Sequence, residues 1–209
     1  MNSVKTKDSN IRTRNKLQIL EAAECEFVLH GFKGTSMQSI ADRAELPKAN
    51  IHYYFKNKEN LYKAVLENII FSWNSVLADM NEQDDPADVL RNFIRVKMQL
   101  SYTNPNGSKI FAMEIVQGAP HLIQYIRKDM RQWVKEKTRV VQSWIDQGKM
   151  RQVDPMHLIF MIWSTTQHYA DFNTQVLEVM NKREYDDDDI ENITEFLTGM
   201  ILRGLELQP

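Results

Sequence analysis

The stretch from Lys58 to Met80 holds neither glycine nor proline, and its apolar residues Leu61, Val65 and Ile69 recur every fourth position. This spacing places them on one face of an α-helix, which we expect to reach about Met80. Much of the chain has the same character, because its 209 residues include 7 glycines and 6 prolines. No segment shows convincing strand alternation. The sequence therefore predicts an all-α protein.

Breaker residues near the N-terminus divide that region into three short helices. Residues 11–30 have their apolar side chains on one face, and the glycines of HGFKGT end this helix. Thr35 and Gln38 have the spacing of a capping box, which predicts that the second helix begins at Thr35. Pro47 suits the first turn of a third helix that extends to Tyr54 at most.

Later breakers predict further helices, which brings the total to about nine. Aspartate precedes proline at 85–86 and at 154–155, and such pairs start helices. Gly148 is expected to end a helix. The last two helices are expected to span about 155–180 and 187–206.

The charge of the chain is unevenly distributed. Residues 1–60 hold ten Lys or Arg and seven Asp or Glu, whereas the whole chain has a net charge of -2. A modestly basic N-terminal part on an acidic remainder suggests a polyanion as the partner of the basic part.

Cysteine usage and hydropathy indicate the compartment. Cys25 is the one cysteine of the sequence, which excludes an internal disulfide and fits a reducing cytosol. The chain has no run of 18 apolar residues, and no signal-type apolar stretch follows its basic N-terminus. We expect a cytoplasmic protein without a membrane segment.

Two short helices joined by a tight turn, with the second free to project, form a helix-turn-helix. The segment PKANIHYYF suits the projecting helix, because its rings and lysine need no burial if a DNA groove receives them. Leu46, Ile51 and Phe55 would hold this helix on the first two. We therefore predict a three-helix DNA-binding head, residues 1–56, and a larger helical domain for ligand binding and dimerisation, residues 57–209.

The stretch GFKGTSMQSIADRAELPKANIHYYFKNKENLYKAVL resembles the DNA-binding domain of the TetR family of transcriptional regulators. The matching landmarks are Gly31-Phe32, Gly34-Thr35, Ile40-Ala41, Tyr53, Phe55 and Lys58-Glu59-x-Leu61. FAMEIVQGAPHLI and VDPMHLIFMIWSTTQHYADF are similar to the ligand domain of pyrimidine-utilisation repressors of that family. The resemblance implies a homodimer that binds operator DNA and takes uracil or thymine as effector. Glu45 and Pro47 depart from the usual Gly and Ser or Thr of the family.

The exposed face of the third helix would read base edges in the major groove. Asn50 can pair with adenine, and Lys48 can donate to guanine. Tyr53 would contact phosphate, which sets register rather than sequence. The residues expected to contact DNA are Thr35, Ser36, Lys48, Ala49, Asn50, His52, Tyr53, Tyr54 and Lys58. Capping alone is the other reading of Thr35 and Ser36, and solvation is the other reading of His52.

Residues 157–172 are apolar on nearly every face at first and then add polar side chains. A helix of this kind lies at the centre of a bundle, where its polar groups need partners. Either these groups satisfy one another, in the core or at an interface, or a small polar ligand does. Uracil suits the second option, because a Gln amide matches one of its edges and aromatic rings cover its faces. The candidate ligand-binding residues are Trp73, Phe111, Met113, Trp163, Gln167, His168, Tyr169 and Asp171.

The last helix has a broad apolar face that could pack against a second copy in a four-helix bundle. This face comprises Ile190, Ile193, Phe196, Leu197, Met200 and Ile201. The four acids at 186–189 are expected to favour the start of that helix. Trp73 lies near the end of the helix that follows the head, so effector binding could shift this helix and change the spacing of two heads.

An enzyme is the first rival class, but the chain has no GxSxG, HExxH, CxxC, P-loop or dinucleotide motif, and its five histidines are scattered. We therefore predict no enzyme, no metal and no cofactor. A purely helical interaction module leaves the basic helix-turn-helix unexplained. The preferred interpretation is a ligand-responsive repressor of the TetR type that senses pyrimidines. The alternative is a regulator of that type that responds to another small molecule, such as a lipid or a drug.

Overall fold

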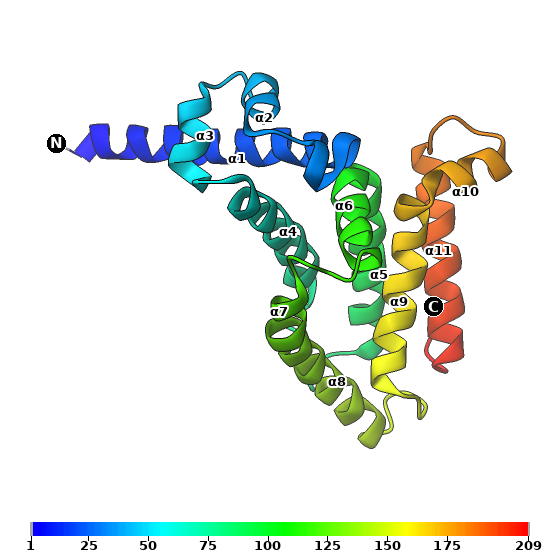
Figure 1. The fold of residues 1–209 in the computed structure, drawn as a ribbon. Coiled ribbons are helices and arrows are strands. Elements are labelled where there is room, and N and C mark those ends of the chain that lie inside the picture. Colours follow the sequence, from blue (N-terminus) through cyan, green and yellow to red (C-terminus); the bar gives the residue numbers. More distant parts are fainter. Residues whose placement is uncertain (1, 209) are drawn as a thin grey trace. The chain divides into compact units, whose positions relative to one another are not determined.

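The computed structural model describes the backbone of residues 2–208 and the side chains of residues 11–208. Every regular element in this part of the chain is helical, as predicted (Figure 1). The α-helices are α1 (Asn2–Gly34), α2 (Met37–Arg43), α3 (Lys48–Phe55), α4 (Lys58–Asn74), α5 (Pro86–Thr103), α6 (Pro105–Val116), α7 (Ile123–Tyr125), α8 (Arg131–Asp146), α9 (Pro155–Asp171), α10 (Asn173–Met180) and α11 (Asp187–Gly204). A 3-10 turn, η1 (Ser75–Leu77), follows α4, and a π-helical turn, η2 (Ile126–Met130), joins α7 to α8.

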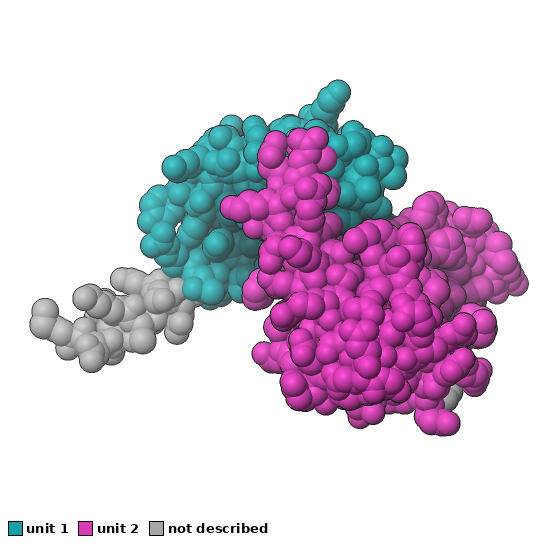
Figure 2. Space-filling view, turned by 90° about the horizontal axis from the view of Figure 1, so that it is seen from below, with its two compact units in different colours: residues 1–69, 109–122 teal, residues 70–108, 123–209 magenta. Residues whose placement is uncertain are grey.

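The chain folds as two compact units, which Figure 2 distinguishes by colour. Unit 1 comprises the residues up to Ile69 and the segment Lys109–Leu122. Unit 2 comprises Ile70–Ser108 and the residues from Ile123 onward. The two boundaries at 69/70 and 108/109 fall inside helices, because α4 and α6 each continue across one of them.

The core of unit 1 joins the first four helices. α1 packs on α2, and α2 packs on α3. The residues predicted to face inward are buried, among them Phe27 on α1, Ile40 on α2, Ile51 on α3 and Leu61 on α4. Helices α1, α2 and α3 therefore share one core, and α4 contributes to it through Leu61.

The start of α2 corrects one prediction. Ser36 is the N-cap, because its Oγ accepts a hydrogen bond from the backbone N–H of Ser39 at 2.9 Å. The Ser39 hydroxyl oxygen in turn accepts from the backbone N–H of Ser36 at 3.2 Å. Thr35 is instead 2% exposed, and its hydroxyl lies 2.9 Å from the carbonyls of both Glu26 and Gly31. Gly31 has a φ of 66° and kinks α1 one turn before its end.

Two helices end earlier than predicted. α4 stops at Asn74 and passes into η1 rather than reaching Met80. The predicted helix 155–180 is divided at Phe172, whose backbone leaves the helical region with φ -113° and ψ 28°. Neither break has a glycine or proline, so the local sequence does not predict where these helices end.

A buried carboxylate ties the segment Lys109–Leu122 to α4 within unit 1. Glu114 accepts from the backbone N–H of His121 at 2.5 Å and from the Tyr62 hydroxyl at 3.2 Å. Burial, aided by the charge of Glu114, raises the pKa of Tyr62. The phenol therefore stays a hydrogen-bond donor to Glu114 at ordinary pH.

The core of unit 2 is built on α5, which packs against both α9 and α11, while α8 packs on α9. Asp85 and Asp154 cap α5 and α9, as the Asp-Pro pairs predicted. Asp186 caps α11 in a capping box with Asp189, so the acidic run stands at a helix start as expected. The main buried core residues are Leu90, Phe93, Ile94, Met98, Val140, Val141, Trp144, Leu158, Ile162, Leu197, Ile201 and Leu202.

Candidate DNA interface and effector site

The turn between α2 and α3 sets the direction of α3. Glu45 adopts a φ of 50°, in the left-handed region where a glycine is more usual. The N–H groups of Glu45 and Leu46 bond to the carbonyls of Asp42 and Ala41 at 3.2 and 3.1 Å. Pro47 then stands at the N-cap of α3. The turn thus keeps its hydrogen bonds although Glu45 lacks the freedom of glycine to adopt a positive φ.

One face of α3 is exposed. Ile51 and Phe55 are buried in unit 1, whereas Lys48, Ala49 and His52 face solvent. Since Ile51 and Phe55 anchor the opposite face, these exposed side chains are available to a partner.

The aromatic part of α3 remains largely outside the core. Tyr53 is 68% exposed, stacks edge-on with Tyr54 at 5.2 Å, and lies under the Arg12 guanidinium at 5.8 Å. Asn50 and Tyr54 are half-buried. His52 Nδ1 donates to the Lys56 carbonyl at 2.9 Å, which leaves Nε2 pointing away from that bond.

Two predicted DNA contacts have partners inside unit 1 instead. The Lys58 ammonium donates to the carbonyls of Phe32 and Thr35 at 2.7 and 2.8 Å, and it reaches that of Lys33 at 3.4 Å. It also lies 4.7 Å from the centre of the Phe32 ring. Because Thr35 is buried and all three Lys58 donors have acceptors, this geometry argues against phosphate binding by these side chains. Ser36 is exposed, although its hydroxyl serves the cap.

A stripe on α9 brings together three of the predicted effector residues. Trp163, Gln167 and Asp171 are spaced by four, so they share one helix face, and all three are half-buried. The Ser108 hydroxyl donates to the Asp171 carboxylate. Trp163 also stacks on Trp133 with 6.0 Å between ring centroids. We call these three residues the α9 stripe.

Trp73 contacts Lys97, a residue that was not among those predicted from the sequence. The Lys97 ammonium lies 4.2 Å from the centre of the Trp73 ring, and Lys97 is 2% exposed. Burial lowers the pKa of Lys97 to about 7, although the charge of Asp171 opposes this shift. The signal was present in the sequence, because Lys97 occupies a position of the apolar stripe of α5 formed by Leu90, Ile94 and Met98.

The other predicted effector residues do not belong to the α9 stripe. His168 is exposed and stacks on Phe172 at 5.2 Å, on a different face of α9 from the α9 stripe. Tyr169 is half-buried and accepts, through its backbone carbonyl, the Tyr185 hydroxyl at 3.0 Å. Phe111 and Met113 are half-buried in unit 1, whereas the α9 stripe belongs to unit 2.

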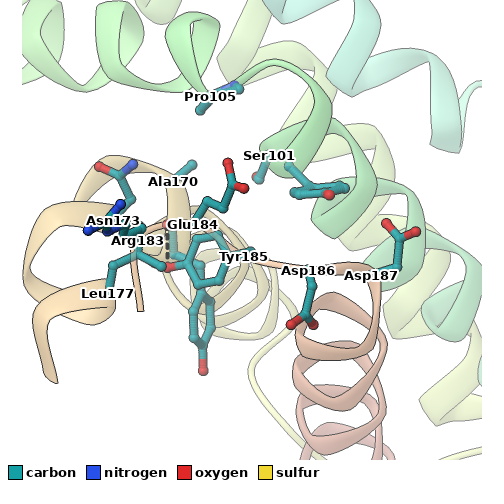
Figure 3. Close-up of a pocket in the computed structure, with 12 residues that line it drawn as sticks. Ser101, Pro105, Ala170, Asn173, Leu177, Arg183, Glu184, Tyr185, Asp186 and Asp187 are labelled. Carbon is teal, nitrogen blue, oxygen red and sulfur yellow. Dashed lines mark hydrogen bonds between the residues drawn. The ribbon is translucent and has the colours of Figure 1, made fainter. Parts of the chain in front are cut away.

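Unit 2 has a cavity of about 710 Å³ between α5, α9, α10 and the segment that leads into α11 (Figure 3). Ser101 and Ala170 form part of its wall, and Tyr185 lies across from them. Tyr169 lines it as well. The α9 stripe and Lys97 are not among its lining residues, so it is distinct from the candidate effector site.

The described side chains contain no group of three or more His, Cys, Asp or Glu placed to hold a metal ion. A search of the described helices for a long apolar segment found none that would cross a membrane.

Comparisons with known proteins agree with this architecture. Residues 19–65 match the family of bacterial regulatory proteins of the tetR type, and residues 66–208 match the C-terminal region of YcdC-like proteins. The HTH-type transcriptional regulator RutR of Escherichia coli K12 is 38% identical over 205 residues, which cover 97% of each chain. The HTH-type transcriptional repressor NicS of Pseudomonas putida is 29% identical over 141 residues, covering 67% of this chain and 65% of that one.

Solved structures give the same fold. The TetR family transcriptional regulator PfmR from Thermus thermophilus superposes with a TM-score of 0.70 at 19% identity, covering 88% of this chain and 97% of that one. At that identity the likeness concerns the fold alone. The two family matches and the similarity to RutR along nearly the whole chain show that this chain is a member of the TetR family of transcription regulators.

Proposed function

We propose that the chain is a TetR-type repressor that senses uracil or thymine and controls pyrimidine metabolism. The observation that carries this proposal is the 38% identity to RutR along 97% of both chains. The resemblance to pyrimidine-utilisation repressors supplies the effector class. The identity of NicS as a repressor supports the negative sign of regulation.

The α9 stripe has the chemistry that a pyrimidine needs. Uracil is a flat ring with alternating carbonyl acceptors and N–H donors. The Gln167 amide offers both a donor and an acceptor, and the Asp171 carboxylate accepts. Trp73 and Trp163 supply flat apolar surfaces of the kind that cover ring faces. His168 and Tyr169 have weaker support, because they lie on other faces of α9. Phe111 and Met113 stay candidates for the effector site.

On the DNA side, we assign base reading to the exposed face of α3. Lys48, Asn50 and His52 would meet base edges, with Ala49 close to them. Tyr53 and Tyr54 would hold the phosphate backbone beside α3. Ser36 would contact DNA at the start of α2, whereas the side chains of Thr35 and Lys58 are bonded within unit 1 and would not. Functionally, we place DNA binding in residues 1–56 and effector binding and dimerisation in residues 57–209.

The dimer is proposed to form through α9 and α11. A groove of about 530 Å³ runs between these helices and is lined almost wholly by apolar side chains, including Met161, Phe196 and Met200. These three residues are exposed, whereas Ile190, Leu197 and Ile201 are already buried in unit 2. A second copy is the occupant that the family implies, and a symmetric interface would satisfy both faces at once.

Effector control is proposed to act through α4. This helix is continuous from Lys58, at the edge of the head, to Asn74, and it carries Trp73 in its last turn. Two reading helices must stand about 34–36 Å apart, or a multiple of it, to enter successive major grooves. A shift of α4 caused by a ring against Trp73 would change that spacing.

The proposal is tested with the full-length chain and the DNA upstream of its own gene. We expect uracil and thymine to raise the melting temperature and to release the protein from this DNA in fluorescence anisotropy. Cytosine and a medium-chain fatty acid serve as comparison compounds. If no pyrimidine stabilises the protein at millimolar concentration, the pyrimidine effector is rejected, while DNA binding is judged separately from the anisotropy.

An apolar effector is the second candidate. A cavity of about 490 Å³ next to Trp163 is lined mainly by apolar side chains, among them Ile126, Met130, Val134 and Phe160. Such a lining suits a lipid or a drug. Stabilisation by the fatty acid and not by uracil would favour this function.

A further inference from the structure

Lys97 lies on the buried face of α5, where the neighbouring side chains are apolar. On α5 it follows Leu90 and Ile94 on the inward face and precedes Met98. Its side chain is as deeply buried as these neighbours, with 2% of the residue exposed. A lysine there brings a charge out of water, which is unfavourable unless the ammonium has partners.

The partners of Lys97 within the chain are incomplete. The face of the Trp73 ring lies 4.2 Å from the ammonium, and the charge of Asp171 acts on it from α9. No charged group on α11 or η1, which also pack on α5, has a resolved effect on Lys97, and α4 meets it through the Trp73 ring. Among the described residues none accepts a hydrogen bond from the Lys97 ammonium. Since no fully buried polar side-chain atom lacks a partner, this ammonium keeps some accessible surface.

Two other lysines of the chain have ammonium groups that are bonded to several backbone carbonyls. Lys58 is bound by three backbone carbonyls of unit 1. Lys149 donates to the carbonyls of Glu82, Gln83 and Asp84 at 2.9, 3.3 and 3.2 Å. Lys97 is more buried than either and has none of these carbonyl bonds. Its three N–H donors therefore remain available to an acceptor that is not part of the chain.

We propose that Lys97 determines which effector binds: its ammonium donates to one carbonyl of a cyclic imide, Asp171 accepts the imide N–H, and Gln167 donates to the second carbonyl. Gln167 and Asp171 lie one turn apart on the α9 stripe, and α9 packs on the helix that carries Lys97. The three side chains thus offer a donor, an acceptor and a donor. This inference rests on the proposed function and specifies its chemistry.

The arrangement selects among pyrimidines by their edges. Around N3, uracil and thymine present a carbonyl, an N–H and a second carbonyl in that order. This edge complements the donor of Lys97, the acceptor of Asp171 and the donor of Gln167. In cytosine, N3 has a lone pair that would face the Asp171 carboxylate, and its amino group would face a donor. 3-Methyluracil keeps both carbonyls but lacks the N–H. Both compounds should therefore bind poorly.

Binding is also coupled to a proton. Lys97 has a pKa of about 7 without an effector, so above pH 7 a growing fraction of the side chain is neutral. An imide carbonyl stabilises the protonated form. Uracil binding should therefore take up a proton above pH 7, and uracil affinity should fall as the pH rises through that value.

Isothermal titration with uracil compares the wild type with Lys97→Met and with Lys137→Met. Lys137 is the matched control, because it lies on α8, is 8% exposed and also has a pKa lowered by burial. We expect Lys97→Met to weaken uracil binding about tenfold or more, as the loss of a hydrogen bond to a charged group implies. The control should change affinity by less than about twofold, because Lys137 takes no part in the proposed site. Circular dichroism establishes that both variants fold, and Lys97→Gln serves as a second variant.

The proton is measured by repeating the titration at about pH 8 in two buffers of different ionisation enthalpy. The wild type should take up a proton, whereas Lys97→Gln, an uncharged donor, should bind uracil without one. If the wild type binds uracil and the Lys97 variants match it in affinity and proton uptake, the Lys97 assignment is overturned and the pyrimidine function stands. If the wild type binds neither uracil nor thymine, both proposals are overturned.

Discussion

Lys97 places a titratable charge beneath the surface of unit 2, and its energetics can be followed without any effector. Its folded pKa of about 7 lies below the ordinary lysine value of 10.5, and burial is the main cause. Between these two values the folded chain binds fewer protons than the unfolded chain. The contribution of Lys97 to stability therefore becomes less unfavourable as the pH rises from 7 to 10.5.

Replacing Lys97 by Met should remove this pH dependence. We expect Lys97→Met to be more stable than the wild type, with the largest gain at and below pH 7. The gain should shrink by on the order of 3 kcal/mol between about pH 7 and about pH 9.5, at 1.36 kcal/mol per pH unit. Urea unfolding without effector at the two pH values measures it. Parallel pH profiles of variant and wild type would contradict the buried charge.

At the scale of elements, Lys58 joins the start of α4 to the end of α1. Its acceptors Phe32 and Thr35 lie 26 and 23 residues earlier in the chain. A lysine in this role stabilises the head and has no donor left for a phosphate. The same residue in a role on DNA would neutralise a phosphate and release a counterion.

The variant Lys58→Met separates these two roles. We expect the free energy of unfolding to fall by about 1–3 kcal/mol, because carbonyls of unit 1 lose their donor. The slope of the logarithm of DNA affinity against the logarithm of salt concentration should stay unchanged. A slope reduced by about one unit would restore Lys58 as a phosphate contact.

α3 is held by Ile51 and Phe55, so substitutions on its outer face can be made without loss of the fold. Asn50→Ala should weaken binding to the preferred operator by about 1–3 kcal/mol and should reduce discrimination at one base pair. Tyr53→Phe should weaken binding to all sequences alike, since a phosphate contact carries no sequence information. Anisotropy with operator variants checks both, and equal losses on every sequence for Asn50→Ala would exclude base reading by that residue.

At the scale of the whole molecule, we expect DNA affinity to depend on two heads, because a single helix as short as α3 offers few side chains to DNA. The apolar groove between α9 and α11 is the surface that we expect to join the copies, and Phe196 is 62% exposed beside it. A charge placed there would be buried without a partner in the dimer.

Phe196→Lys should therefore give a monomer in light scattering and should lower DNA affinity at least about tenfold, the equivalent of 1.4 kcal/mol. Val179→Lys is the matched control, because Val179 on α10 is 83% exposed and does not line the groove. This control should remain a dimer with normal affinity. A dimeric Phe196→Lys would place the interface elsewhere.

Local chemistry explains most of what could be predicted from the sequence. Helix periodicity placed Leu61, Val65 and Ile69 inward, and all three are buried. The Asp-Pro pairs marked the starts of α5 and α9, since a cap acts over two or three residues. The family followed from residues close together in the chain.

Tertiary structure decided the partners of individual side chains. Thr35 and Ser36 are adjacent, yet the Thr35 hydroxyl is buried against the carbonyls of Glu26 and Gly31, and Ser36 caps α2. The breaks at Asn74 and Phe172 have no local breaker, so they depend on the surroundings of each helix. Lys58, Lys97 and Asp171 each contact residues far away in the sequence. Periodicity reports which face of a helix is buried, whereas the hydrogen bonds and charges that meet a side chain there are set by the packing of distant segments.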